Sequence, residues 1–375
     1  MPAPRTSPAA PPRPRAAADP TGISRPAALE AALELLPGDA FLDGPGMAVH
    51  GPMGAEALSG LGHDDLVVAW VEAYRQRHRP HSAPPRVARL DADAPDTWRA
   101  ALGDRSRLGD WRDLFDAELA EAPWSEVVAT WVPRLVDGYG GFLTHGLLRT
   151  AHAVRILEAL PAVDPPRVAL HELAMGLAFW AGTYQPLPGR IRLDGDASLA
   201  EAMARIPRAT GPWGPVERAF FEPLAGLEGF APAVESLGPP WTPDPLGDLT
   251  LAFARALVAH PEAPTDALVH TVTPIVAART LLPHVPARTV AHVYAAAWQV
   301  GAGILACFTP DRPVDVTRSP AGEPLAPPEL VARAVENRAP HAVKMTEACL
   351  QEHALRPDPA YLLAAGRAVA GTEPW

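Results

Sequence analysis

The segment Pro340-His341-Ala342-Val343-Lys344 places a histidine three residues before a lysine. Residues three apart share one face of an α-helix, so the imidazole of His341 and the amine of Lys344 are expected to reach the same space. Imidazole binds transition metals, whereas a lysine can bind one only when it is neutral or when carbon dioxide has converted it to a carbamate. The spacing therefore suggests a metal site. The competing interpretation of Lys344 is a lysine whose amine reaches solvent.

Three further histidines lie in apolar, helix-like surroundings: His50 in HGPMGAEAL, His145 in THGLLRTAH and His270 in LVHTVT. A single buried histidine is usually a hydrogen-bonded core residue. Burying four such rings in one core without a shared partner is costly, and a metal ion supplies that partner. We therefore expect these three histidines and His341 to bind one metal.

His145, Arg149 and His152 fall on nearly one helical stripe, because steps of four and seven residues rotate by about 400° and 700°. His145 and His152 would lie roughly 10 Å apart along a straight helix, too far to bind one metal comfortably. We predict His145 as the ligand, and Arg149 and His152 as catalytic groups of the pocket. The alternative for Arg149 and His152 is an interior ion-pair network.

The remaining histidines carry weaker signals. Three are weak ligand candidates: His171, His284 and His292. Five resemble surface or helix-capping residues and are given no role: His63, His78, His81, His260 and His353.

Motifs for other cofactors and reactions are missing from the sequence. It contains no GxxxxGK[ST] loop, no GxSxG elbow and no HExxH helix. The nearest approach to a dinucleotide fingerprint is Gly301-Ala302-Gly303, which lies in an apolar helical stretch without a preceding strand or a third glycine in register. No motif therefore supports a flavin, NADPH or another nicotinamide, and redox chemistry would have to come from a metal.

Composition narrows the partners and the compartment. The formal net charge is -11 and no block of Lys and Arg opposes it, so nucleic acid is not an expected partner. Cys307 and Cys349 have no paired spacing, which predicts buried free thiols in a reducing compartment. No continuous apolar segment occurs in residues 1–20, and we expect a cytoplasmic protein. The apolar stretch Val290–Phe308 contains His292 and Gln299, which favours a buried core helix over a membrane span.

Apolar residues recur at helical spacing from Arg25 onward, and most prolines fall between these stretches. We predict a disordered tail over residues 1–24 and a single all-α domain over 25–375, an irregular multi-helix bundle with a central apolar pocket and no strand. The expected helices are 27–36, 47–61, 64–78, 98–102, 111–120, 124–135, 143–160, 166–183, 199–206, 216–221, 231–236, 249–259, 267–282, 286–308, 328–337, 340–351 and 359–369.

Three segments, HGPMGAEALSGLG, THGLLRTAHAVRIL and HAVKMTEACL, resemble those of the questin oxidase-like proteins of aromatic polyketide pathways. The resemblance implies an all-helical non-haem iron dioxygenase that oxidatively opens a ring of an anthraquinone-like substrate. It also implies an iron held by four histidines and a carbamylated lysine, which here are His50, His145, His270, His341 and Lys344. The chain departs from the fungal proteins at Arg149, where they often have a further histidine.

The leading hypothesis is thus an iron-dependent oxygenase acting on an aromatic small molecule and dioxygen. One alternative is an NADPH-assisted Baeyer-Villiger oxidase that uses the same pocket. The other is a non-catalytic helical protein that binds an apolar small molecule, with histidines that only satisfy one another. The sequence leaves the oligomeric state open.

Overall fold

A computed structural model describes residues 24–209, 221–312 and 314–375 of the chain. Helices make up most of these residues, as the periodicity predicted, and the all-α fold class is confirmed. The predicted tail up to residue 23 and the predicted helix over 216–221, except for its last residue, lie outside the described residues.

The first part of the chain forms eight α-helices and a short hairpin. They are α1 (Arg25–Leu35), β1 (Leu42–Asp43), β2 (Met47–Ala48), α2 (Gly51–Gly60), α3 (Asp64–Arg77), α4 (Pro95–Arg99), η1 (Arg105–Arg107), α5 (Leu108–Glu121), α6 (Trp124–Leu135), η2 (Val136–Gly138), α7 (His145–Ala159) and α8 (Arg167–Gly182).

The second part adds the remaining helices. They are α9 (Leu199–Arg205), η3 (Glu222–Gly226), α10 (Phe230–Glu235), α11 (Pro245–Ala259), α12 (Thr265–Leu268), η4 (Val269–Thr271), α13 (Thr273–Leu281), η5 (Leu282–His284), η6 (Ala287–Thr289), α14 (Val290–Phe308), α15 (Pro327–Asn337), α16 (Pro340–Leu355) and α17 (Pro359–Gly371).

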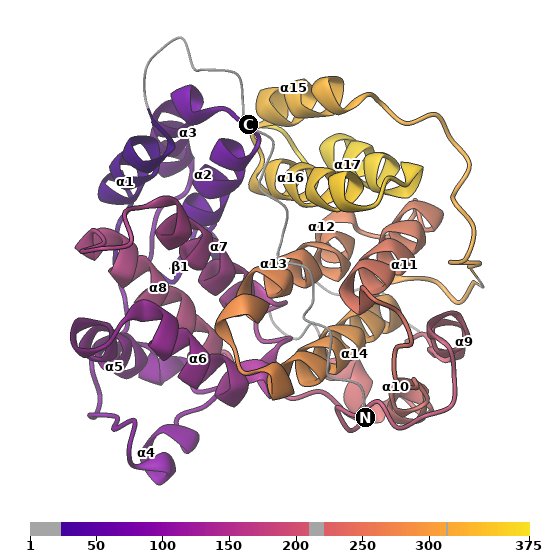
Figure 1. Cartoon of the computed structure of the whole chain (residues 1–375), viewed down its shortest axis with the longest axis horizontal. Coiled ribbons are helices and arrows are strands. Elements are labelled where there is room, and N and C mark those ends of the chain that lie inside the picture. The colour runs from indigo at the N-terminus through magenta and orange to yellow at the C-terminus, as the bar shows by residue number, and fades with distance from the viewer. Residues whose placement is uncertain (1–23, 210–220, 313) are drawn as a thin grey trace.

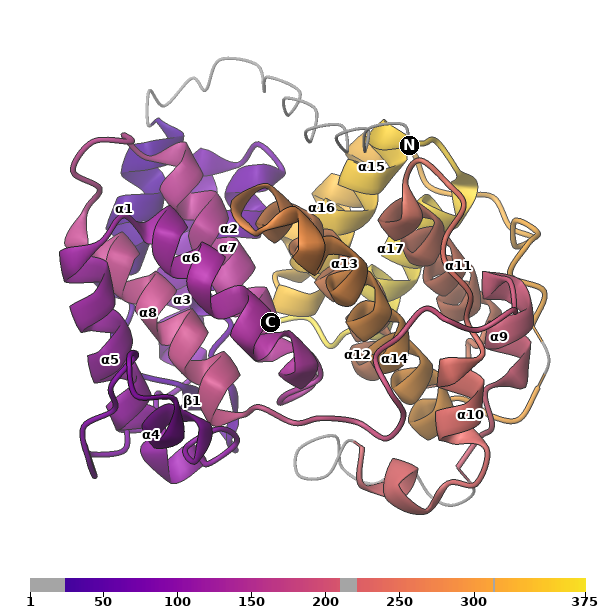
Figure 2. The ribbon, with the colours of Figure 1, turned by 60° about the horizontal axis from the view of Figure 1, so that its bottom comes forward.

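The two parts lie side by side, with α1 to α8 on one side of the molecule and α9 to α17 on the other (Figures 1 and 2). Helix α7 packs along α8 in the first part, and α16 packs along α17 in the second. Contacts of α16 with α2, and of α13 with α7, join the parts. One hydrophobic cluster runs through both, from Leu29 to Ala368, so the boundary between the parts is itself packed core.

Helix α14 lies within this core. The stretch Ala287–Phe308 is long and apolar enough to cross a membrane, yet 83% of its most apolar window is buried inside the fold. This burial is what the sequence predicted for a core helix. Both cysteines, Cys307 and Cys349, are buried and unbonded, again as predicted.

The hairpin corrects two expectations at once. Helix was predicted from Met47 and no strand anywhere, whereas Met47–Ala48 pairs antiparallel with Leu42–Asp43 and α2 begins only at Gly51. The turn between the strands contains Gly44 and Gly46, both with positive φ, which lets the chain reverse within three residues.

A second correction concerns the helix predicted over 267–282. The structure divides this stretch into α12, the 3-10 turn η4 and α13. Pro274 has no amide hydrogen to give to the carbonyl of His270, which favours a break in the α-helix here. The break leaves His270 in a tight turn rather than within a long helix.

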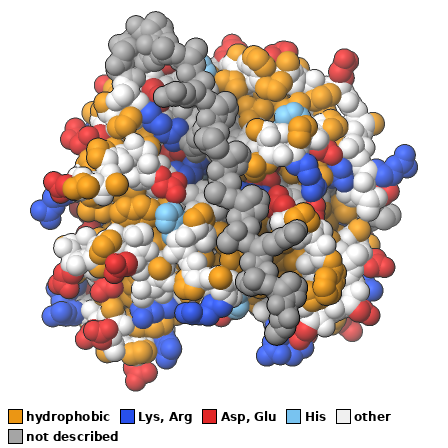
Figure 3. Space-filling view, in the orientation of Figure 1, with side chains coloured by type: hydrophobic (Ala, Val, Ile, Leu, Met, Phe, Trp, Pro, Cys, Tyr) orange, Lys and Arg blue, Asp and Glu red, His pale blue; other side chains and the backbone are white. Residues whose placement is uncertain are grey.

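On the face shown in Figure 3, basic, acidic and apolar side chains are interspersed.

Candidate metal centre

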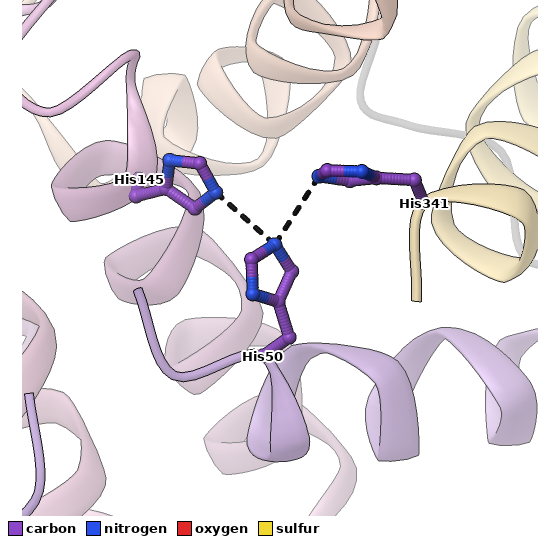
Figure 4. A group of neighbouring side chains, drawn as sticks. All are labelled: His50, His145 and His341. Carbon is purple, nitrogen blue, oxygen red and sulfur yellow. Dashed lines mark hydrogen bonds between the residues drawn. The ribbon is translucent and has the colours of Figure 1, made fainter. Parts of the chain in front are cut away.

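Three histidine side chains from distant parts of the chain meet where the two halves of the fold touch. His50 precedes α2, His145 begins α7 and His341 lies in the first turn of α16 (Figure 4). The Nε2 atom of His50 lies 3.1 Å from Nε2 of His145 and 3.2 Å from Nε2 of His341. All three ligand atoms lie within 4.8 Å of one another, a grouping that could hold one metal ion.

The opposite ring nitrogens fix which atoms carry hydrogen. The Nδ1 atoms of His50 and His145 lie 2.6 Å and 2.7 Å from the backbone oxygens of Ala48 and Phe142. A carbonyl can only accept, so these Nδ1 atoms are the protonated ones and the Nε2 atoms present lone pairs. His341 follows the same pattern, because its Nδ1 donates to Asp266 Oδ1 at 3.0 Å. Outer hydrogen bonds of this kind are typical of metal-binding histidines.

The distances from Nε2 of His50 to the other two Nε2 atoms also fit a metal ion. Two nitrogens bound at about 2.1 Å are about 3.0 Å apart at a right angle and about 3.4 Å apart at the tetrahedral angle. The observed 3.1 and 3.2 Å lie between these values. Neutral imidazoles with facing lone pairs repel one another, and a cation among them would turn that repulsion into three bonds.

His270 lies beside this group. Its ring centroid is 4.6 Å from that of His145 and 5.3 Å from that of His341. Its Nδ1 is hydrogen-bonded to Thr144 Oγ1 at 3.1 Å, and its buried Nε2 has no hydrogen-bond partner among the described residues. The predicted fourth histidine is therefore next to the cluster with a nitrogen available, although it does not share the tight three-nitrogen group.

Lys344 is buried near the same histidines. Its side chain is 2% exposed, and Nζ has no hydrogen-bond partner among the described residues. The interpretation of Lys344 as a solvated surface lysine is therefore wrong. Burial lowers the pKa of the amine to about 7, against the opposing effect of Asp266.

Burial also lowers the pKa values of His50, His145 and His270 well below their usual value, and the charge of Lys344 adds to this effect. Neutral imidazole is the form that binds metals. The interior thus keeps these three rings in the ligating form.

The hairpin and α3 hold His50 in place. Ala48 of β2 supplies the oxygen for His50 Nδ1, and the backbone N–H of His50 donates to Tyr74 Oη at 2.8 Å. Tyr74 in turn donates to the buried carboxylate of Asp43 in β1. Burial raises the pKa of Asp43 to about 6, with the Tyr74 hydrogen bond acting against it.

A strained turn holds His145. Phe142, Leu143 and Thr144 have φ values of 46°, 50° and 69°, a left-handed conformation that costs roughly 1–2 kcal/mol for each residue with a side chain. Helix α7 consequently begins at His145, two residues later than predicted. The turn directs the oxygen of Phe142 to His145 and the hydroxyl of Thr144 to His270. Strain of this kind is concentrated at functional sites.

Arg149 and His152 belong to interior ion pairs. The guanidinium of Arg149 donates to both carboxylate oxygens of Glu172, at 2.6 and 2.8 Å, and to the oxygen of Ala40. His152 Nδ1 lies 2.8 Å from Glu56 Oε2. The network that the sequence left as an alternative is therefore present, and the catalytic roles stay a prediction.

Sequence reasoning missed the residues that hold the candidate ligands, namely Asp43, Ala48, Tyr74, Phe142, Thr144 and Asp266. Asp266 precedes His270 by four residues in DALVH, a spacing that favours a contact with His270, whereas its carboxylate accepts from His341. The dipeptides Asp43-Gly44 and Pro45-Gly46 are turn signals that could have found the hairpin, whereas the left-handed turn before His145 has no such signal.

The weaker histidine candidates lie in carboxylate pairs outside the cluster. His171 pairs with Asp116, His284 with Glu158 and His292 with Asp137. His63, His78 and His260 flank helix ends, as expected of capping residues.

Two clefts open near the first helices. One, of about 790 Å³, is lined by residues of α1 and α3, and the other, of about 280 Å³, lies between α3 and α15. Histidines of the cluster line neither cleft, so a pocket at the metal centre stays a prediction.

Comparisons with known proteins do not assign this chain to a family. The sequence matches no protein-family model, and no curated protein matches it. The resemblance to questin oxidase-like proteins therefore remains a prediction from three segments.

Proposed function

We propose that the chain is an oxidoreductase, an iron-dependent oxygenase that cleaves a ring carbon–carbon bond of an anthraquinone-like aromatic polyketide. The metal part of the proposal depends on one observation. The Nε2 atoms of His50, His145 and His341 converge, and their lone pairs point toward one another. The substrate class comes from the sequence resemblance.

The proposed ligands are these three histidines together with His270 and Lys344. Neutral histidines around a divalent ion leave its charge unbalanced in a buried site, which is unfavourable. A carbamate on Lys344 would add a negative oxygen donor and would also remove a buried amine that has no hydrogen-bond partner among the described residues. Ferrous iron in such a nitrogen and oxygen ligand set supplies dioxygen activation.

Iron is chosen over other metals on the resemblance, since imidazole also suits zinc, copper and nickel. Metal analysis after expression in iron-supplemented medium is the direct measurement of this choice.

His152 is the acid–base group of the proposal. Because its Nδ1–H is donated to Glu56, its Nε2 is left to accept a proton. Burial lowers the pKa of His152, and the charge of Lys344 acts in the same direction on it and on His50, His145, His270 and His341. Arg149, with its three donor contacts to Glu172 and Ala40, is given a structural role instead.

The test is turnover of a hydroxyanthraquinone by protein purified without oxygen. We expect one iron per chain, oxygen uptake on mixing with substrate and air, and a ring-opened product without NADPH. Protein depleted of metal by a chelator should lose this activity and regain it with ferrous iron.

Each alternative gives a different outcome. Metal-free protein that forms product only with NADPH would establish the Baeyer-Villiger oxidase instead. Protein that binds the anthraquinone but takes up no oxygen with iron bound would be a non-catalytic binder. The matched control for ligand variants is His292→Ala, which removes a histidine with a carboxylate partner outside the cluster.

A further inference from the structure

The histidines of the centre differ in how their outer nitrogens are anchored. Three of the anchoring groups belong to buried residues, namely Ala48, Phe142 and Thr144. The fourth, Asp266, has a side chain that is 53% exposed. His341 is therefore anchored by an exposed residue, whereas the other three histidines are anchored by buried residues.

His341 is also the most exposed of the four histidines. Its side chain is 14% exposed, whereas His50, His145 and His270 are buried, at 7%, 2% and 2% of the whole residue. Its Nε2 still reaches to 3.2 Å from that of His50. His341 thus completes the nitrogen group while its other side meets solvent.

Asp266 also links two parts of the centre. It lies in the four-residue helix α12, directly before the turn η4 that contains His270, and it accepts the hydrogen bond of His341 from α16. This contact therefore fixes α16 against the segment of His270.

The anchors differ in how readily they break. A hydrogen bond at an exposed carboxylate can be exchanged for water, so its net contribution is small. Turning His50, His145 or His270 away would instead leave the buried groups Ala48 O, Phe142 O or Thr144 Oγ1 without these partners, which costs more in a low-dielectric interior. Of the four rings, His341 is the one that can turn outward at the least cost.

Building on the proposed metal function, we infer that the metal enters and leaves past His341. Asp266 is the positioning residue that keeps the Nε2 of His341 turned inward. Without the Asp266 carboxylate the ring turns outward more often, and the metal both loads and dissociates faster.

The experiment uses the full chain, Zn²⁺ as the probe and a chromogenic chelator that reports released zinc. Wild-type protein is expected to bind one zinc per chain. Asp266→Ala should release it about tenfold faster or more, within the range known for partners of metal-binding histidines, with Asp266→Asn in between. The loading rate of apo-protein should also rise in Asp266→Ala.

Two controls separate this inference from a general loss of affinity. Asp137→Ala removes a half-exposed carboxylate that also pairs with a histidine, His292, and should leave both rates within about twofold of wild type. Thr144→Val removes the buried partner of His270, so it should speed release but leave the loading rate unchanged.

The inference is overturned if zinc leaves Asp266→Ala within twofold of the wild-type rate, or if Thr144→Val accelerates loading as much as Asp266→Ala. A wild-type chain that binds no zinc, iron or other transition metal is a separate result, because it removes the proposed metal function itself.

Discussion

The Nε2 atoms of His50 and His145 lie 3.1 Å apart, although both rings have given their Nδ1 hydrogens to backbone oxygens. Each Nε2 therefore presents a lone pair to the other, and His341 adds a third. Such an arrangement is unfavourable without a cation, so bound metal should stabilise the fold strongly.

The first prediction concerns this stabilisation. Adding Zn²⁺ or anaerobic Fe²⁺ to chelator-treated protein should raise the melting temperature, with about 2.7 kcal/mol gained when free metal is one hundred times its Kd. His50→Ala should abolish the increase, because it removes the nitrogen that contacts both others. Differential scanning fluorimetry with and without metal measures the effect. His292→Ala should keep the wild-type increase, and an increase retained in His50→Ala would place the metal elsewhere.

A second prediction concerns the buried amine of Lys344, which is 2% exposed and has no hydrogen-bond partner among the described residues. Methionine has similar length and no charge to bury, so Lys344→Met should raise the free energy of unfolding of metal-free protein by about 1–3 kcal/mol. The same change should weaken metal binding. Urea unfolding in the presence of a chelator gives the first quantity and metal titration the second.

The control for Lys344→Met is Arg333→Met. It replaces an exposed cation whose ion-pair partner, Glu329, is also exposed. It should change neither quantity appreciably. If Lys344→Met destabilises the metal-free protein and leaves metal affinity intact, Lys344 is a structural residue and no ligand.

The helices and the histidines of the candidate site could be found from sequence because they depend on local patterns. A stripe of apolar residues defines α8 or α14 without knowledge of its neighbours. The histidines stood out since four polar rings in apolar helices need a common partner, and the structure brings those four together.

The anchoring groups could not be found in this way. The oxygens of Ala48 and Phe142 belong to backbone, which every residue has, and only the hairpin and the left-handed turn direct them to the histidines. Whether His152 faced the candidate metal site or an ion pair depended on Glu56, which lies 96 positions away in the sequence. Long-range pairing of this kind has no local sequence signal.

A third prediction uses the raised pKa of Asp43, about 6 because of burial. The usual value is near 3.8, so the folded state favours the protonated carboxyl. The raised pKa therefore costs no folding stability below about pH 4. The loss of stability grows between about pH 4 and pH 6 and is constant above pH 6, at up to about 3 kcal/mol.

Asparagine can accept the Tyr74 hydrogen bond but does not ionise. The stability of Asp43→Asn relative to wild type should therefore increase between pH 4.5 and pH 7.5, measured by urea unfolding at both. Asp137→Asn, at a half-exposed carboxylate, is the comparison. An Asp43→Asn difference that is the same at both pH values contradicts the raised pKa.

The last prediction separates a structural from a catalytic Arg149. Its guanidinium and the carboxylate of Glu172 are both buried, so Arg149→Met leaves an unpaired charge and should cost about 3–5 kcal/mol of stability. Adding Glu172→Leu should restore most of that loss, because the remaining charge is removed. Metal stoichiometry should be unchanged in both variants. If the double variant regains stability and oxygenase turnover together, Arg149 acts only through the fold; if stability returns without turnover, the catalytic role predicted from the sequence is correct.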